Sequence, residues 1–121
     1  MTRILIIEDE APLRANIARL FIAEGFEIIE AADGAAGVEL AIRELPDLIV
    51  CDIMMPELDG FGTLFSLREN VTTSHIPFIF LTASARDFDR KWSFELGADC
   101  YLTKPFRLDD LLAEVKKRLG K

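Results

Sequence analysis

Short apolar runs alternate along the chain with longer segments in which apolar residues recur at helical spacing. The first run, residues 3–7 (RILII), ends in acids, and Pro12 follows where the first turn of a helix tolerates proline. The apolar positions of the next segment recur at i, i+4, i+7 and i+8 and are Leu13, Ile17, Leu20 and Phe21. Gly25 is a natural stop for this helix. The pattern predicts a strand followed by a helix with one buried face.

The same strand and helix unit recurs to the end of the chain. Further apolar runs lie at 26–30, 47–51, 77–81 and 100–102, and helical patterns lie at about 34–44, 60–69 and 85–96. A last helix carries one apolar stripe, formed by Leu108, Leu111, Leu112, Val115 and Leu119. Five strands alternating with five helices predict an α/β fold with a parallel sheet covered on both faces. The third and fourth runs are apolar on both faces and suit central strands.

Composition limits the number of domains and the kinds of partner. The 121 residues are half hydrophobic and carry a net charge of −7, which predicts one globular domain over residues 1–121. An acidic surface repels nucleic acid and anionic membranes, so we expect no direct contact with either. The first apolar run is too short for a signal peptide or a membrane helix. The expected location is therefore cytoplasmic.

The cysteines and the single histidine offer no metal or disulfide pattern. Cys51 and Cys100 lie far apart without metal-ligand spacing, so both are predicted to be small buried residues. His75 lies in a polar turn before Pro77 and is predicted to be exposed. We expect no role for it as a phosphohistidine.

Polar side chains directly follow four of the predicted strands. They are Glu8, Asp9 and Glu10 after the first run, Asp52 after the third, Thr82 after the fourth and Lys104 after the fifth. In a doubly wound sheet the carboxyl ends of the strands meet at one edge, where functional groups collect. These carboxylates, a hydroxyl and an ammonium are therefore expected to share one site.

Such a site has the groups that a phosphoryl transfer needs. Clustered carboxylates repel one another, and Mg²⁺ prefers one or two of them together with water and phosphate oxygens. Asp52 could then attack phosphorus in line and become an acyl phosphate. Lys104 and Thr82 could donate hydrogen bonds to the new phosphoryl oxygens.

Each of these residues also has a purely structural interpretation. Asp52 alone could belong to a turn or cap a helix, and Glu8 and Asp9 could cap the first helix. Lys104 alone could be a solvated surface lysine. The joint spacing of these residues with Thr82 favours the functional interpretation.

Several short motifs resemble those of a known family across nearly the whole chain. They are Glu8-Asp9, Asp52 with Met54-Met55-Pro56 and Asp59-Gly60, Leu81-Thr82-Ala83, and Gly97-Ala98-Asp99 running into Tyr101-Leu102-Thr103-Lys104-Pro105-Phe106. The sequence resembles the receiver domains of two-component response regulators, including the single-domain chemotaxis regulators. The resemblance implies a flavodoxin-like fold, with a doubly wound five-stranded parallel sheet of strand order 2-1-3-4-5 and five helices.

The resemblance also assigns roles to single residues. Asp52 is implied as the phosphoacceptor, Asp9 as a direct metal ligand, Glu8 as a ligand acting through water, and the backbone carbonyl of Met54 as a further ligand. The implied cofactor is Mg²⁺, which Mn²⁺ could replace. Glu8 stands where aspartate is commoner, and its longer side chain is expected still to reach the hydration shell of the metal.

Two further features follow from the resemblance. Thr82 and Tyr101 are implied as a switch pair, in which the hydroxyl moves toward the phosphoryl group and the ring turns inward; Tyr101 could otherwise be only a core aromatic residue. A cis peptide is implied at Lys104-Pro105, where it aims the ammonium group. Phosphorylation would add charge and acceptor oxygens that bias this pair.

The implied partners are those of a signalling phosphoacceptor. They are a sensor histidine kinase or histidine phosphotransfer protein and a downstream protein or linked output domain, and a homodimer could form on phosphorylation. The signal would pass through the surface of the fourth helix, fifth strand and fifth helix. Cys100 replaces an acid that is frequent in the subfamily with winged-helix outputs, which weakens assignment to that subfamily and its dimer contacts. The domain is expected not to be an enzyme with turnover on external substrates.

The fourth helix contains two aromatic residues that the core cannot both accept. Trp92 and Phe94 lie about 160° apart on a helical projection. The family pattern places Phe94 and Ala98 inward, which would leave Trp92 and Leu96 as an apolar pair on the output surface. We expect a partner or dimer contact at this pair.

Three rival functions can each be distinguished from that of a receiver domain by one feature of the sequence. A haloacid-dehalogenase-like phosphatase would need an acid two residues after Asp52, where the chain has Met54. A flavodoxin-like cofactor module would bind phosphate after the first strand, where this chain has three repelling acids. An unphosphorylated pseudo-receiver is disfavoured because the full residue set is present.

Some properties stay open at this level. They are the cognate kinase, the output pathway, the oligomeric state and the lifetime of the acyl phosphate, although Met54 and Ser84 stand where the family tunes that lifetime. The chain could be a whole regulator or the receiver part of a longer protein.

Overall fold

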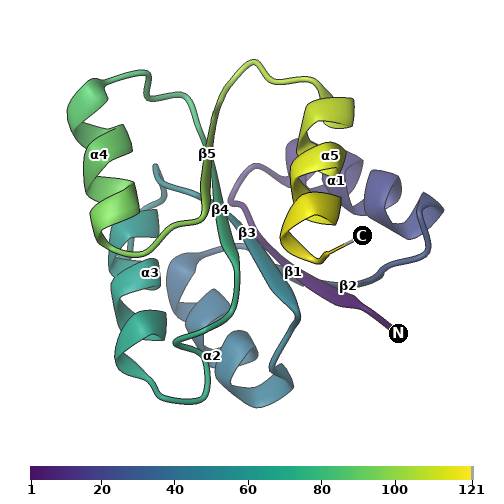
Figure 1. Cartoon of the computed structure of the whole chain (residues 1–121), viewed down its shortest axis with the longest axis horizontal. Coiled ribbons are helices and arrows are strands. Elements are labelled where there is room, and N and C mark those ends of the chain that lie inside the picture. The colour runs from purple at the N-terminus through teal and green to yellow at the C-terminus, as the bar shows by residue number, and fades with distance from the viewer. Residues whose placement is uncertain (121) are drawn as a thin grey trace.

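The computed structural model describes residues 1–120 as five strands and five helices in strict alternation (Figure 1). The strands are β1 (Arg3–Ile7), β2 (Glu27–Ala31), β3 (Leu48–Asp52), β4 (Phe78–Thr82) and β5 (Cys100–Thr103). The helices are α1 (Ala11–Ala23), α2 (Gly34–Glu44), α3 (Gly60–Glu69), α4 (Asp87–Glu95) and α5 (Leu108–Arg118). The predicted alternation is confirmed, with bounds that agree closely with the apolar pattern.

All five strands run parallel in the order β2-β1-β3-β4-β5. The predicted strand order is therefore confirmed. Every residue of β3 and β4 is buried, as expected of strands covered on both faces. The register pairs Ile7 with Cys51 and Thr82 with Thr103, so the residues that follow these strands come to one edge of the sheet.

Helices cover both faces of the sheet and enclose two apolar cores (Figure 1). On one face α1 and α5 pack on the sheet through Ile17, Phe21, Leu111 and Val115. On the other face α2, α3 and the segment after α4 supply Ala41, Leu64, Leu67 and Ala98. Cys51 and Cys100 are both buried and unoxidised, and His75 is exposed, as predicted.

Local sequence sets the end of α1 and the start of α3. Gly25 adopts a φ of +92° just after α1, as its role as a stop requires. The Asp59 side chain accepts a hydrogen bond of 2.9 Å from the Gly62 N–H and caps α3. Gly60 lies against the backbone of Asp52 and Ile53, where a side chain would not fit. This close approach holds α3 directly beside the end of β3.

Over residues 1–120, no helix combines the length and the apolar character needed to cross a lipid bilayer.

Candidate metal and phosphoryl site

Three carboxylates meet at the carboxyl edge of the sheet. Oxygen atoms of Glu8, Glu10 and Asp52 lie within 4.8 Å of one another. Glu8 and Asp52 are buried, with 2% and 4% of their surface exposed, and Glu10 is exposed. Glu8 directly follows β1 and Asp52 ends β3, which are neighbouring strands. The predicted convergence of acids from separate loops is therefore present.

Lys104 supplies the cation that faces these acids. Its Nζ lies 3.1 Å from Asp52 Oδ2, 3.3 Å from Glu8 Oε1 and 3.9 Å from Glu10 Oε1. Its backbone N–H also donates a hydrogen bond of 2.7 Å to the Thr82 carbonyl, which fixes the start of this loop against β4. The predicted cis peptide between Lys104 and Pro105 is present. One ammonium group thus faces three carboxyl groups.

The titration of Glu8 reflects its burial at this site. The pKa of Glu8 is raised from 4.5 to about 7, chiefly because the carboxyl group is buried; the charge of Asp52 adds to the rise, and the Glu10 N–H and Lys104 oppose it. Burial by itself would lower the pKa of Lys104. The hydrogen bond to Asp52 and the charges of Asp52 and Glu8 outweigh burial, so the pKa of Lys104 is raised.

This donor set fits a divalent cation that prefers oxygen. Carboxylates and water are the usual ligands of Mg²⁺, and the lysine leaves part of their negative charge uncompensated. The Met54 N–H donates a hydrogen bond of 3.2 Å to Asp52 Oδ1, so the turn after β3 also lies at the site. The Met54 carbonyl as a ligand stays a prediction.

The three converging acids differ in one member from the metal-ligating acids that the family resemblance implies. Asp9 is exposed and lies beside Glu8, and it does not belong to the three converging carboxylates. Glu10 takes that place, because the turn into α1 brings its N–H to within 3.2 Å of Glu8 Oε2. Asp9 as a direct metal ligand stays a prediction. The run of three acids after β1 indicated that Glu10 lies near the site. The spacing of these acids could not predict that the turn places the Glu10 carboxylate, and not that of Asp9, beside Glu8 and Asp52.

Thr82 and Tyr101 lie on either side of the loop that joins β4 to α4. Thr82 is fully buried, and its hydroxyl accepts a hydrogen bond of 3.1 Å from the Ser84 N–H. The ring of Tyr101 is also buried, and its hydroxyl donates a hydrogen bond of 2.7 Å to the Ser84 carbonyl. In this structure the Tyr101 ring therefore occupies the inward position.

The expectation for the aromatic residues of α4 is wrong in one respect. Trp92 and Phe94 are equally exposed, at 41% each, so Phe94 does not face the core. The buried stripe of α4 consists of the polar residues Asp89 and Ser93, and the two aromatic residues flank it. Leu96 is half-buried and packs against the apolar core. The expected exposed pair of Trp92 and Leu96 is thus replaced by Trp92 and Phe94.

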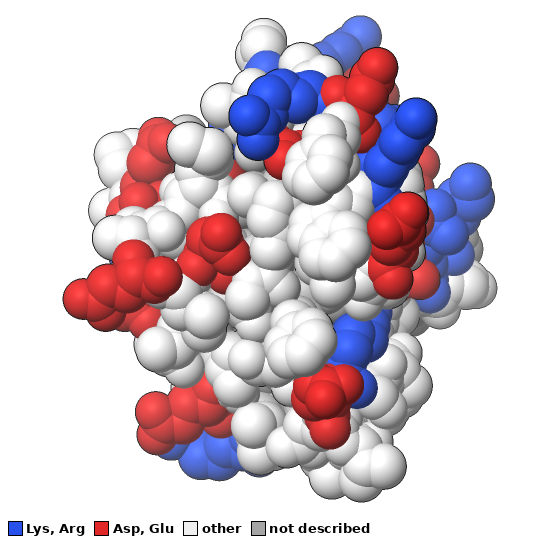
Figure 2. All heavy atoms as spheres, turned by 90° about the vertical axis from the view of Figure 1, so that its left-hand side faces the viewer, with Lys and Arg blue, Asp and Glu red and all other residues white. Residues whose placement is uncertain are grey.

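These aromatic residues belong to a largely uncharged surface. Figure 2 shows the side of the molecule formed by α3 and α4, where a strip of uncharged side chains runs between charged groups. The exposed aromatic residues of the two helices are Phe65, Phe88, Trp92 and Phe94. The Arg90 guanidinium lies over the rings of both Phe94 and Tyr101, at 5.5 and 5.8 Å from their centres. Phe94 therefore lies on the β5 side of α4.

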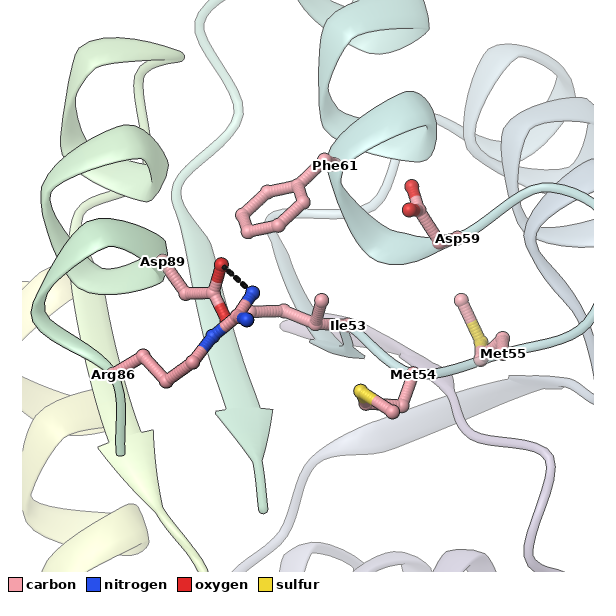
Figure 3. A pocket seen from close by; sticks show the side chains of 7 residues that line it. All are labelled: Ile53, Met54, Met55, Asp59, Phe61, Arg86 and Asp89. Atoms are coloured by element: carbon pink, nitrogen blue, oxygen red, sulfur yellow. Dashed lines mark hydrogen bonds and ion pairs between the residues drawn. The ribbon is translucent and has the colours of Figure 1, made fainter. Parts of the chain in front are cut away.

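A cavity of about 430 Å³ opens beside the site, between α3 and the start of α4 (Figure 3). Its walls are Ile53, Met54, Met55, Asp59, Phe61, Arg86 and Asp89. Met54 belongs to the turn that contacts Asp52, and Arg86 and Asp89 form an ion pair across the cavity wall. The pairing of Arg86 with Asp89 was not predicted from the sequence, because it depends on the path of the loop after β4.

The chain matches a known protein family over most of its length. A family model described as "Response regulator receiver domain" matches residues 4–116. The "DNA-binding dual master transcriptional regulator RpaA" of Synechocystis sp. is 40% identical over 119 residues, which are 98% of this chain and 49% of that protein. The "Transcriptional regulatory protein DltR" of Streptococcus agalactiae is 39% identical over 116 residues, covering 96% of this chain and 51% of that protein. The chain spans about half the length of these curated relatives.

Solved structures agree with the topology described above. A putative response regulator from Chloroflexus aurantiacus superposes with a TM-score of 0.93 at 29% identity, covering 99% of this chain and 98% of that one. The receiver domain of a sensor histidine kinase from Pseudomonas aeruginosa gives a TM-score of 0.90 at 30% identity, with the same coverage. That structure has a magnesium ion coordinated in its active-site cleft.

Proposed function

Because this chain belongs to the response regulator receiver family, we propose that Asp52 accepts a phosphoryl group from a histidine kinase or a histidine phosphotransfer protein in a Mg²⁺-dependent reaction. The observation that carries this proposal is the position of Asp52, buried among Glu8, Glu10 and Lys104 at the edge of the sheet. Receiver domains are signalling phosphoacceptors of two-component systems.

The proposed reaction exchanges one bond to phosphorus for another. An Asp52 carboxylate oxygen attacks the phosphorus of a phosphohistidine, the new O–P bond forms, and the N–P bond breaks to release the imidazole. When bound, Mg²⁺ supplies charge neutralisation and orientation for the phosphoryl oxygens. Glu8, Glu10 and Asp52 are the side chains in position to hold it, with Asp9 and the Met54 carbonyl as further candidates.

Two donors are placed to stabilise the transferred group. The Lys104 ammonium already donates a hydrogen bond to Asp52 Oδ2. It can donate to a phosphoryl oxygen once that oxygen carries the negative charge. The Thr82 hydroxyl uses its oxygen to accept from the Ser84 N–H, which leaves its proton free to donate. Tyr101 would complete the switch pair, since its ring is buried and its hydroxyl bonds to the carbonyl of Ser84, the residue whose N–H bonds to Thr82.

The same reasoning extends to partners and output. We propose that the domain does not turn over external substrates, acts in the cytoplasm and passes its signal through the surface of α4, β5 and α5. The exposed Phe94 and Trp92 on α4 support a protein contact on that helix, either with an output partner or within a homodimer. The transcriptional regulators it resembles are about twice as long, which supports a linked output domain as one form of that partner.

The rival functions gain no support from the site. Met54 is exposed and provides no proton donor for a phosphatase mechanism. The acids after β1 would repel the phosphate of a nucleotide cofactor. The complete set of acceptor, acids, Thr82 and Lys104 gives no reason to assign an unphosphorylated interaction module.

The test is intact-mass spectrometry after incubation with acetyl phosphate, with and without Mg²⁺. Wild-type protein should gain one phosphoryl group only with Mg²⁺, and Asp52→Asn should gain none. Asp87→Asn is the matched control, because Asp87 is an exposed aspartate on α4 outside the site and should behave like wild type. Folded wild-type protein that neither gains mass nor binds beryllofluoride would exclude the proposed function.

A further inference from the structure

Ser84 is the residue that connects the two members of the switch pair. Its backbone N–H donates to the Thr82 hydroxyl at 3.1 Å, and its backbone carbonyl accepts from the Tyr101 hydroxyl at 2.7 Å. The position of this one residue therefore determines whether both contacts form together. Any contact that fixes the position of Ser84 therefore also preserves its hydrogen bonds with the Thr82 and Tyr101 hydroxyls.

Asp89, in the first turn of α4, holds the Ser84 side chain. The Ser84 hydroxyl donates a hydrogen bond of 2.6 Å to Asp89 Oδ2. The Arg86 guanidinium donates to both carboxylate oxygens, at 3.1 Å from Nε to Oδ2 and 3.0 Å from Nη2 to Oδ1. Asp89 is only 5% exposed, although it is charged and lies outside the group of acids around Lys104. A buried carboxylate with three donors in fixed geometry is a rigid anchor.

The charge state of Asp89 agrees with this geometry. The hydrogen bond from Arg86, and next the one from Ser84, lower the pKa of Asp89 below its usual value. The carboxylate therefore stays ionised and accepts from Ser84 at neutral pH.

We propose that Asp89 is a positioning residue for phosphoryl acceptance: it anchors Ser84, and through Ser84 it holds the Thr82 hydroxyl ready to donate while the Tyr101 ring stays inward. The proposal rests on the proposed function in one respect, namely that Thr82 donates to the phosphoryl group. The physical basis is preorganisation, because the hydrogen bond from the Ser84 N–H restricts the orientation of the Thr82 hydroxyl and leaves its proton available to donate.

The anchor lies at the wall of the cavity shown in Figure 3, where Arg86 and Asp89 face Met54 across the opening. The Arg86 side chain is 76% exposed, whereas Asp89 is buried. A surface arginine thus completes an internal anchor. Its removal can weaken the anchor without disturbing the core, which gives a second variant that should fold.

The single tyrosine of the chain allows a direct test. Fluorotyrosine incorporated into the protein gives one ¹⁹F resonance, which reports the surroundings of the Tyr101 ring without any phosphorylation. In wild type it should report a buried ring. In Asp89→Ala it should shift toward the position of solvent-exposed fluorotyrosine, because Ser84 loses its anchor.

Matched variants separate positioning from a general loss of charge. Asp87→Ala removes an exposed acid from the same turn of α4 and should leave the resonance at its wild-type position. Asp89→Asn retains an acceptor for Ser84 and should restore most of the wild-type signal, and Arg86→Ala should give an intermediate shift. A resonance in Asp89→Ala that matches wild type would overturn the proposal. If Asp89→Ala fails to fold, an unshifted resonance in Arg86→Ala would overturn it instead.

Beryllofluoride binding with Mg²⁺ provides the functional readout. Asp89→Ala should bind it more weakly than wild type by roughly threefold to tenfold, the range expected for one or two lost hydrogen bonds. Equal binding by Asp89→Ala and wild type would overturn the positioning role. If wild type itself does not bind, the proposed function fails, while the ¹⁹F resonances still decide whether Asp89 anchors the loop.

Discussion

The Lys104 ammonium donates a hydrogen bond of 3.1 Å to Asp52 across 52 residues of sequence. The same ammonium also lies 3.3 Å from Glu8, so one lysine offsets the repulsion between two buried acids. The arrangement has consequences for stability as well as for chemistry, because buried carboxylates without a counter-charge are costly.

Replacement of Lys104 by methionine should destabilise the metal-free protein. Removal of the ammonium leaves Asp52 and Glu8 without their shared partner, and the free energy of unfolding should fall by about 1–3 kcal/mol. Urea denaturation in the absence of divalent ions measures this change. Lys117→Met, at an exposed position on α5, is the control and should change little. Added Mg²⁺ should recover part of the loss in Lys104→Met. Equal stability of the two variants would contradict the account of the ion pair.

The stability of the metal-free protein should decrease as the pH rises toward neutrality. The pKa of Glu8 is about 7 in the folded chain, against an ordinary value of 4.5, so the folded state holds a proton that the unfolded state has lost. This contribution is complete below about pH 4.5 and is lost as the pH passes about 7. Urea denaturation between about pH 5 and about pH 8 should show the decline. Glu8→Gln should flatten it, whereas Glu69→Gln, at an exposed position on α3, should retain it.

Mg²⁺ should bind more tightly at higher pH for the same reason. Glu8 must be ionised beside a bound cation, so binding releases a proton when the pH is below the pKa of about 7. Calorimetric titration should show the affinity rising by roughly tenfold between about pH 6 and about pH 8. In Glu8→Gln the affinity should be lower and nearly independent of pH. Proton release that is the same in wild type and in this variant would assign the titration to another group.

Two glycines of α3 should respond to alanine in opposite directions. A Cβ at Gly60 would meet the Asp52 carbonyl oxygen and lie 2.6 Å from the Ile53 Cα, so backbone would have to move. Gly60→Ala should therefore lower the free energy of unfolding by about 1–3 kcal/mol and weaken phosphoryl acceptance at Asp52. A Cβ at Gly62 would be crowded only by the flexible end of Leu58, at 2.6 Å, and would lie at ordinary contact distance, 3.5 Å, from Asp59 Oδ1. Gly62→Ala should be neutral or stabilising by up to about 1 kcal/mol through helix propensity, as thermal unfolding of both variants would show.

Most of the fold could be predicted because each element carries its own periodicity. The apolar run RILII forms β1 over Arg3–Ile7, as predicted. Ile17 and Phe21, which recur at helical spacing, lie on the buried face of α1. The exception was α4. Its buried stripe is made by the polar residues Asp89 and Ser93, so an apolar pattern could not identify the inward face. Phe94 was therefore wrongly predicted to face the core.

The site could be predicted in outline, since strands of a parallel sheet end at one edge. Asp52, Glu8 and Lys104 meet as expected. The choice between Asp9 and Glu10 depends on the backbone of a short turn, which leaves no periodic signal. The anchor at Asp89 depends in the same way on the path of the loop after β4 and became visible only in three dimensions.

The site draws on residues from nearly the full length of the domain, from Glu8 after the first strand to Lys104, 96 residues later. During synthesis, Asp52 leaves the ribosome well before Lys104, the lysine that faces it. A nascent chain that ends soon after β3 therefore contains Asp52 but lacks both its counter-charge and β5, the strand that leads to Lys104. If Asp52 accepts a phosphoryl group as proposed, the chain would become competent to receive it only once β5 and Lys104 have been added.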